Sequence, residues 1–208
     1  MLVPLDTDLW SHEFTLAWQR GLVPIPVRMT VIRLRDGRLV LHSPAPLDAN
    51  LGAELDALGE VAFIVVPDAH GKFAAAAAAA YPRAQALKDV FPAEWRGELE
   101  TFAVRGFRLR EVVLFHAPTR TLVITDLCFN IRESPRAFAR FFFRANGMWR
   151  RFGPSRIIRA LAVSDGAALR ESLDVIARWD FARIVPGHGE VIENAPRSVL
   201  HEAWFGAR

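Results

Sequence analysis

The sequence predicts an α+β protein built around a two-layer β-sandwich, and three observations carry this prediction. Val27–Leu34 is β-rich and alternating, and an Asp-Gly turn in "RDGR" joins it to the run "LVLHS", which predicts a β-hairpin. Val61–Val66 is an apolar run of strand length that leads through a short loop into seven alanines, which predicts strand, loop and helix. The second half is again rich in strands and also ends in a histidine-containing loop.

Several other segments have the periodicity of helices. Leucines recur at helical spacing in Asn50–Leu58 and Gly59 closes the segment, which predicts a short amphipathic helix. The stretches "DGAALRESLDVIARW" and "PRSVLHEAWF" predict two more helices near the carboxyl end. Ser134 and Pro135 can supply an N-cap and a first-turn proline, so we expect a further helix from there to about Asn146.

The strands of the second half are predicted from three β-rich runs. These runs are "LETFAVRG", "LREVVLFH" and "TLVITD", and the loop "APTR" between the last two has hairpin length. An antiparallel meander is therefore expected. The later stretch "FARIVPGHGEVI" predicts a strand that ends in a glycine-rich turn.

Composition limits the kinds of protein that this sequence can be. The 208 residues contain no Ser/Gly-rich linker, so we expect one domain over 1–208, with a basic and aromatic helical insertion around 132–160. The apolar runs are too short for a transmembrane segment. The first residues lack the basic start of a secretory signal, so a cytoplasmic location is expected. Cys128 is the single cysteine, which excludes a zinc site made of several thiolates.

Acidic and histidine side chains follow the predicted strands at points where loops often form sites. Asp68 and His70 follow "FIVV", Asp126 follows "LVIT", and His188 lies in "PGHG". Two imidazoles and two carboxylates suit Zn, Fe or Mn. Each residue taken alone has a structural interpretation as well, since Asp and His are common in turns and caps.

Longer motifs give the sequence a family resemblance. "GEVAFIVVPDAHGKF", "TLVITDLCF" and "RIVPGHGEVI" resemble the second, fourth and fifth motifs of the metallo-β-lactamase fold, and the hairpin stands where that fold begins. Runs such as "RMTVIRL" and "EVVLFH" also resemble an uncharacterised bacterial branch of the fold, a domain of unknown function. The resemblance implies a four-layer αββα sandwich, in which metal ions between the two sheets activate water for hydrolysis.

This chain departs from the family at most of the metal ligands. The family's main metal loop reads His, any residue, His, any residue, Asp, His, and it falls on Asp68–Phe73, where His70 alone matches. The histidine of the third motif falls on Phe107, whereas Asp126 matches the bridging carboxylate and His188 the last histidine. The resemblance therefore implies at most one Zn, Fe or Mn ion, or none, held by the reduced set Asp68, His70, Asp126 and His188.

Two functions of different classes follow from this reduced set. The first is a divergent hydrolase acting on a small ester, lactone or phosphoester, with Asp126 and Lys72 as catalytic residues and Lys72 stabilising a developing oxyanion. The alternative is a non-catalytic pseudoenzyme that kept the fold and binds a small anionic molecule or an anionic membrane surface. An ammonium at position 72 would repel a nearby metal ion or stand in for a lost one.

Three other residues have both a structural and a functional interpretation. His42 and His116 lie near predicted strand ends, where each is expected to be a core histidine or to support a ligand through a hydrogen bond. Cys128 follows Asp126 by two residues, so it is expected either beside the site or as a small buried apolar residue.

A series of arginines stands out in the insertion. Every fourth residue is an arginine over one stretch, and on a helix this spacing would place the four charges along one face, as Arg132, Arg136, Arg140 and Arg144. Nearby phenylalanines add aromatic bulk. The stripe is interpreted as a solvated face, as a cap that contacts an anionic substrate, or as a surface that contacts anionic lipid. One stripe on a chain of net charge +3 is a weak indication of nucleic-acid binding.

Overall fold

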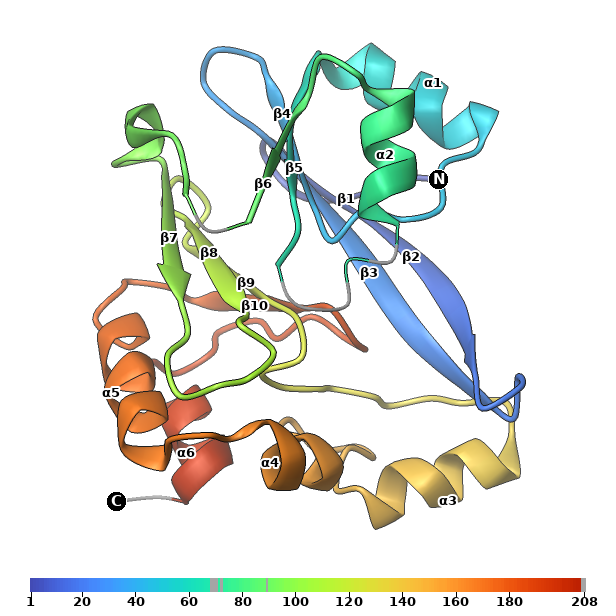
Figure 1. Cartoon of the computed structure of the whole chain (residues 1–208), viewed down its shortest axis with the longest axis vertical. Coiled ribbons are helices and arrows are strands. Elements are labelled where there is room, and N and C mark those ends of the chain that lie inside the picture. Colours follow the sequence, from blue (N-terminus) through green and yellow to red (C-terminus); the bar gives the residue numbers. More distant parts are fainter. Residues whose placement is uncertain (68–70, 72, 89, 207–208) are drawn as a thin grey trace.

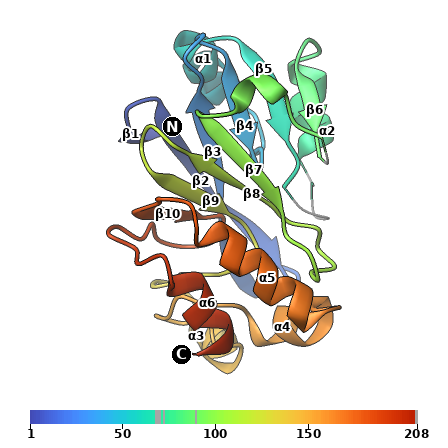
Figure 2. The same ribbon diagram turned by 90° about the vertical axis from the view of Figure 1, so that its left-hand side faces the viewer.

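The computed structural model describes residues 1–67, 71, 73–88 and 90–206. It confirms the mixed α+β class and the four-layer order that the sequence predicts. Two β-sheets face each other, helices α1 and α2 cover one sheet, and α5 and α6 cover the other (Figures 1 and 2). Side chains far apart in the sequence therefore meet wherever loops from both sheets reach the same edge.

The first sheet contains the predicted hairpin and the strand before the alanine helix. Its strands lie in the order β1-β2-β3-β4-β5-β6, and β4, β5 and β6 run parallel to one another. Their bounds are β1 Val3–Asp6, β2 Leu9–Trp18, β3 Val23–Arg33, β4 Leu39–His42, β5 Val61–Val65 and β6 Gln85–Leu87. The hairpin is the β3–β4 pair, and Asp36 and Gly37 lie in its turn as expected.

The second sheet contains the predicted meander. Its order is β10-β9-β8-β7, in which β7, β8 and β9 are antiparallel neighbours and β10 pairs in parallel with β9. The bounds are β7 Leu99–Ala103, β8 Val112–His116, β9 Thr121–Ile124 and β10 Arg183–Pro186. The parallel pair follows because a long segment that contains helices separates β9 from β10.

Helices begin and end mostly where the sequence signals predict. Asp48 caps the first helix by accepting from the Leu51 amide, and Asp165 caps the fifth by accepting from two amides. The bounds are α1 Ala49–Leu58, α2 Ala74–Ala80, α3 Ala137–Ala145, α4 Arg156–Ala162, α5 Gly166–Ile176 and α6 Val199–Phe205, with a 3-10 turn at Ala93–Trp95.

Three apolar layers hold the sandwich together. Met29 and Ile64 belong to the layer between the first sheet and α1 with α2. Between the two sheets lies a second layer, to which Ile32 and Val123 belong. The third layer, which includes Trp204, lies under α5 and α6. Because alternate residues of one strand point to opposite faces, β3 supplies side chains to two of these layers.

The sequence analysis missed the long arm that β2 and β3 form. Ten residues of β2 pair with β3 from Leu9↔Ile32 to Trp18↔Val23. Along the outer half of this arm one face is partly buried and apolar, while the opposite face, which carries Glu13, Thr15 and Ala17, is exposed. The alternation of large apolar residues with polar or small ones over 13–17 is visible in the sequence and is typical of a strand. Figure 1 shows the tip of the arm beside α3.

The expected start of α3 was wrong. Ser134 is not its N-cap, because Arg136, whose backbone is extended, holds that position and the helix begins at Ala137. The Arg140 guanidinium accounts for the difference, since it donates to the carbonyl oxygens of Ser134, at 2.9 Å, and Pro135, at 3.3 Å. These carbonyls, which a longer helix would use for its first turn, are bonded to a side chain instead.

The later start of α3 also corrects the expected arginine stripe. Arg132 and Arg136 precede the helix, so Arg140 and Arg144 are the members of the series that lie on it. Arg132 donates to the side chain of Asn130 at 3.0 Å, and Arg136 donates to the carbonyl of Gly21 at 2.6 Å. The charges are thus spread between a loop and a helix, which reduces their mutual repulsion.

Gly106 is predicted to be essential for packing the second sheet against α5. Its φ of +70° favours glycine, and an added Cβ would lie 2.1 Å from the Asp165 carbonyl oxygen. Gly106→Ala should therefore lower the free energy of unfolding by about 3 kcal/mol or more. Gly97→Ala is the matched control: its φ is +80° with open space around it, so we expect a loss of about 1 kcal/mol. Equal losses in urea unfolding would contradict the steric argument.

Candidate functional site

Asp126 and His188 meet at one edge of the second sheet. Strand β10 pairs in parallel with β9, with Pro186 opposite Ile124, and each site residue follows its strand by two positions. Parallel strands end at the same edge, so the two side chains converge there. His188 Nε2 lies 3.2 Å from Asp126 Oδ1. The sequence predicted that these two residues would converge, and the structure brings them together.

The ring of His188 is held in one orientation. Its Nδ1 lies 2.8 Å from the carbonyl oxygen of Pro26 on β3, and the Phe129 ring stacks on it with centroids 4.8 Å apart and planes at 12°. A carbonyl oxygen only accepts, so Nδ1 carries a proton and donates it. Nε2 is therefore the nitrogen that faces the Asp126 carboxylate. A histidine fixed in this way through its other nitrogen has the arrangement that is typical of metal ligands and catalytic bases.

Glycines shape the turn that carries His188. At Gly187 an added Cβ would lie 3.1 Å from the Thr125 Cα, and at Gly189, where φ is +93°, it would lie 2.2 Å from the Asn130 carbonyl oxygen. The turn is also bonded to the loop after β9, since the Asn130 amide donates to the His188 carbonyl at 2.9 Å. Close backbone approach therefore explains why "PGHG" has glycine on both sides of the histidine.

Two buried charged residues support the site, and the sequence analysis missed both. The Arg28 guanidinium donates to the Pro186 carbonyl at 2.7 Å and pairs with Glu13, which joins the first sheet to the end of β10. A Glu111 carboxylate oxygen accepts from the Thr125 amide at 2.7 Å, directly before Asp126. The available signal was a charged residue within or directly before an apolar strand run, because a buried charge is kept where it is bonded.

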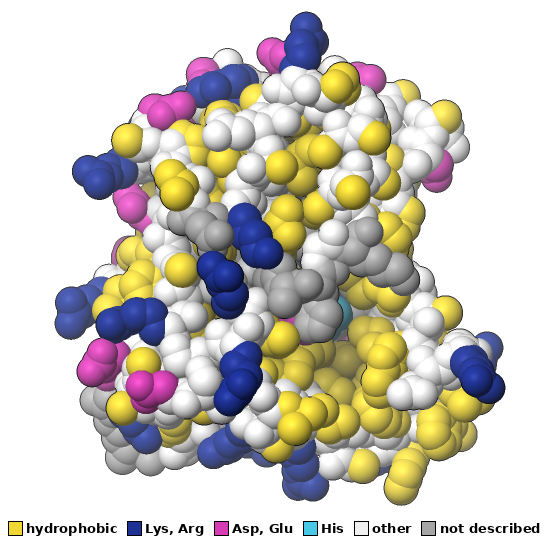
Figure 3. Space-filling model, in the orientation of Figure 1, with side chains coloured by type: hydrophobic (Ala, Val, Ile, Leu, Met, Phe, Trp, Pro, Cys, Tyr) yellow, Lys and Arg dark blue, Asp and Glu magenta, His cyan; other side chains and the backbone are white. Residues whose placement is uncertain are grey.

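A pocket of about 400 Å³ opens at this pair. Its polar residues include Thr125, Asp126 and His188. Apolar side chains from the β2–β3 arm and from the α3–α4 region make most of its walls. Figure 3 shows a hollow lined by hydrophobic side chains, with a histidine visible at its edge. The apolar lining residues are Phe14, Leu16, Trp18, Ile25, Val27, Pro44, Pro67, Phe73, Phe129, Phe142, Met148, Ile157 and Ile158.

The expected metal set is only partly described. Asp68, His70 and the proposed catalytic Lys72 lie outside the described residues. Within the described part of the chain, no group of three or more His, Cys, Asp or Glu side chains could share an ion. Asp126 and His188 nevertheless fit half of a mononuclear site, because Nε2 and a carboxylate oxygen point at one another while Nδ1 is already bonded. A mononuclear site would need further donors.

Phe107 and Cys128 have structural roles in the described residues. Phe107, which falls on the family's third metal motif, packs edge-on against Trp204 with ring centroids 5.9 Å apart in the outer apolar layer. Cys128 belongs to the same layer, and its burial raises the pKa of its thiol well above the usual value. Of the two interpretations of Cys128, a small buried apolar residue agrees better with this position.

His42 and His116 are buried in the strands. His42 lies at the end of β4 and its ring donates to the Val112 carbonyl across the sandwich, while burial lowers its pKa to about 4. His116 lies 2.8 Å through Nδ1 from the Thr119 hydroxyl, and burial lowers its pKa to about 4 as well. Neither lines the pocket. Both are neutral core histidines at pH 7.

Comparison with solved structures decides the fold. A metallo-β-lactamase from Hirschia baltica matches 99% of this chain and 96% of its own at 13% identity and a TM-score of 0.64. FIM-1 from Pseudomonas aeruginosa, in a mono-zinc form, matches 99% and 93% at 14% identity and a TM-score of 0.64. The chain has the metallo-β-lactamase fold. A metallo-β-lactamase from Erythrobacter litoralis also matches, over 98% and 93% of the two chains at 14% identity and a TM-score of 0.65.

The sequence comparisons are less specific than the structural ones. Residues 7–96 match a family described as "Domain of unknown function (DUF4336)". No protein of curated function matches the chain significantly. At 13–14% identity the structural likeness establishes the metallo-β-lactamase fold alone. Activity must therefore be argued from the residues of this chain.

The two core histidines predict how stability depends on pH. Because both pKa values are lower in the folded chain than the usual 6.5, the unfolded chain binds more protons between pH 6.5 and about 4. The stability that depends on these neutral histidines is fully present above pH 6.5, and it is lost as the pH falls toward 4. We expect His42→Gln to remove about 2 kcal/mol of the decrease that urea unfolding measures between pH 7 and pH 4.5. An unchanged pH dependence would contradict a neutral buried His42.

Proposed function

We propose that this protein is a divergent hydrolase of the metallo-β-lactamase fold, with a reduced site that holds at most one metal ion. The observation that carries the proposal is the Asp126–His188 contact of 3.2 Å, with the histidine fixed by Pro26 and the pair facing a pocket. A carboxylate and an oriented imidazole at the end of a cavity are the groups that hydrolytic chemistry requires.

Each residue of the pair has a proposed role. Asp126 is 6% exposed, and its carboxylate holds a proton or a cation beside His188. His188 presents Nε2 to the pocket, because Nδ1 is engaged with Pro26. Asp68 and His70 would complete the donor set for Zn, Fe or Mn, and such an ion would polarise a carbonyl or phosphoryl oxygen. Lys72 is proposed to stabilise the developing oxyanion.

The proposed substrate is a small ester, lactone or phosphoester. The pocket of about 400 Å³ has a size that is ordinary for small-molecule sites. Stacking by Phe129 and the burial of Asp126 exclude water from two sides of the pair. A reacting group bound there would be close to both Nε2 and the carboxylate, which is the arrangement needed for proton transfer.

A second candidate function is a non-catalytic protein that binds an anionic ligand or membrane surface. Helix α3 favours it, because Phe138 is 53% exposed and Phe141 is 67% exposed on a helix that also carries Arg140 and Arg144. Exposed aromatic residues next to cations are typical of helices that lie on anionic lipid. In the described part of the chain no helix has the length and apolarity to span a bilayer, so contact would be with the surface.

Metal content is the first test of the hydrolase. Untagged protein incubated with Zn, Fe or Mn and then desalted should retain about one equivalent of one ion, measured by elemental analysis. His188→Ala should lose most of it, because the substitution removes the imidazole, which is one of the proposed donors. His12→Ala is the control: the His12 ring lies beside Met1 at the N-terminus and is not among the proposed donors, so its metal content should be unchanged. No retained metal, or equal retention in both variants, would contradict the metal site.

Vesicle binding tests the second candidate. Phe138→Ser with Phe141→Ser should weaken co-sedimentation with phosphatidylglycerol vesicles about tenfold or more, because two exposed rings lose their burial in lipid. Val90→Ser is the matched control, since Val90 is 80% exposed but lies outside α3. Replacing Arg136 by Glu should reduce binding further at low salt and less at high salt. Equal binding by all variants would rule out this surface.

A further inference from the structure

Few of the side chains that line the pocket are polar. Asp126, His188 and Thr125 lie together at the edge of the second sheet. The other lining residues are aliphatic and aromatic apart from Ser43, Ser155 and two glycines. A ligand that fits such a cavity has one polar end and one long apolar part. Polar groups of a ligand placed against the apolar walls would lose their hydrogen bonds to water without finding new partners.

One long wall is the inner face of the β2–β3 arm. Strand register places Phe14 opposite Val27 and Leu16 opposite Ile25, so these four side chains share one face. At a rise of about 3.4 Å per residue, the wall from Phe14 to Trp18 is about 14 Å long. It is therefore much longer than one ester group, and a linear chain could lie along it.

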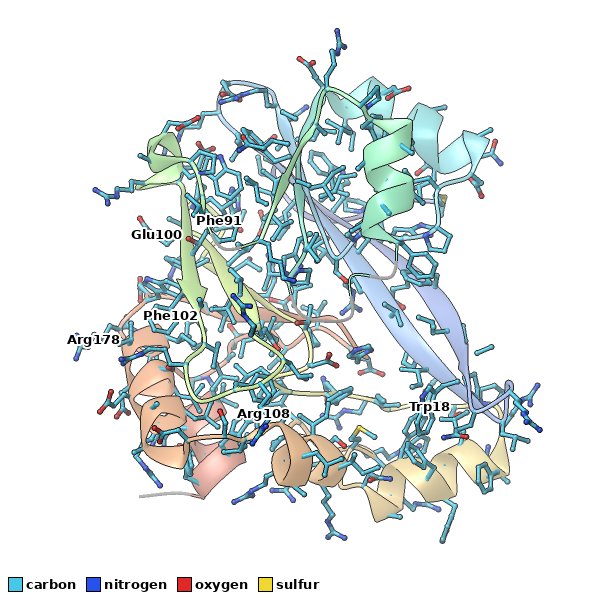
Figure 4. All side chains as sticks on the ribbon, in the orientation of Figure 1. Trp18, Phe91, Glu100, Phe102, Arg108 and Arg178 are labelled. Atoms are coloured by element: carbon cyan, nitrogen blue, oxygen red, sulfur yellow. The ribbon has the colours of Figure 1, made fainter. Side chains whose placement is uncertain are left out.

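A second wall comes from the segment that follows β9, to which Phe129, Phe142 and Met148 belong. At the tip of the arm this segment contacts the first wall, because the Phe142 ring of α3 packs on the Trp18 ring with centroids 5.1 Å apart. Figure 4 shows Trp18 at the end of the arm, beside α3. At the rim Trp18 is 39% exposed and Ile157 is 42% exposed, so the apolar surface continues from the cavity to the outside. A chain longer than the cavity could leave it along this rim.

We propose that the pocket binds the linear acyl chain of an amphiphilic ester or lactone, with the acyl carbonyl at Asp126 and His188 and the chain along the β2–β3 arm. The proposal deepens the hydrolase above and rests on it for the identity of the reacting group. The binding of the chain does not depend on that reaction, because it uses residues that contact neither Asp126 nor His188 as a hydrogen-bond partner. It is therefore measured with ligands that cannot be hydrolysed.

Neutral 1-alkanols measure the contribution of the acyl chain to the binding affinity without a reacting group. Isothermal titration of the full-length protein with 1-hexanol, 1-octanol and 1-decanol should give dissociation constants that fall about fourfold for each added methylene, or about fifteenfold for each step of two. The affinity should stop rising once the chain fills the cavity. Affinities that do not increase from hexanol to octanol, or a failure of 1-decanol to bind, would overturn the proposal.

Two neighbouring positions on β2 provide a matched pair of variants. Leu16 faces the pocket, whereas Ala17 is on the exposed opposite face of the same strand. Leu16→Trp should reduce the affinity for 1-octanol about tenfold or more by occupying the cavity, and Leu16→Asn should also reduce it by making the wall polar. Ala17→Trp should bind 1-octanol as the unmodified protein does. If Leu16→Trp and Ala17→Trp have the same effect, the alkanol binds elsewhere and the proposal fails.

The same samples distinguish a failure of the proposed acyl-chain site from a failure of the proposed hydrolase. Leu16→Trp should keep the metal content of the unmodified protein, because Leu16 is not among the proposed donors. A normal alkanol series without retained metal would contradict the proposed hydrolase and support the acyl site. Retained metal with no dependence on chain length would do the reverse. Far-UV circular dichroism of each Leu16 variant checks that the sandwich is intact.

Discussion

The buried guanidinium of Arg28 is the constraint on which the site depends. It extends from β3 of the first sheet to the Pro186 carbonyl of the second, and the Arg28 amide also donates to the Gly187 carbonyl at 2.8 Å. These bonds fix the position of the turn that carries His188, and the carbonyl oxygen of Pro26, two residues earlier on β3, accepts a hydrogen bond from His188 Nδ1. Two alternate positions of one strand, Pro26 and Arg28, thus set how the two sheets meet, which is why the pair stays aligned although its residues come from distant segments.

Local sequence patterns predicted the strands and helices that depend on local sequence alone. Alternation and the Asp-Gly turn identify the β3–β4 hairpin, and amphipathic periodicity identifies α5. The start of α3 could not be found in this way. Ser134 and Pro135 form an ordinary cap signal, but Arg140 binds their carbonyls, and a contact between a helix and its own preceding loop is not visible in a pattern of propensities.

The proximity of Asp126 and His188 was predictable from the sequence, whereas the surroundings of this pair were not. Asp126 and His188 were identified because each follows an apolar strand, and the parallel pairing of those strands then determines that they meet. The support from Arg28 and Glu111 required knowledge of which strand faces which, as did the apolar pocket. The pocket is formed by one face of an arm whose first strand lies at the start of the chain, more than a hundred residues from Asp126 in the sequence.

The β2–β3 arm has a consequence for how this fold can change its ligand. Its outer half carries no residue of the layer between the sheets, and the side chains of this half that line the pocket, unlike the buried Val23, are not fully buried. Substitutions there should alter the shape of the cavity at little cost to folding, since large losses of stability come from fully packed positions. Different residues therefore determine which ligand binds and how stable the fold is. The β2–β3 pair can be redesigned for a new ligand while the Asp126–His188 edge is left as it is.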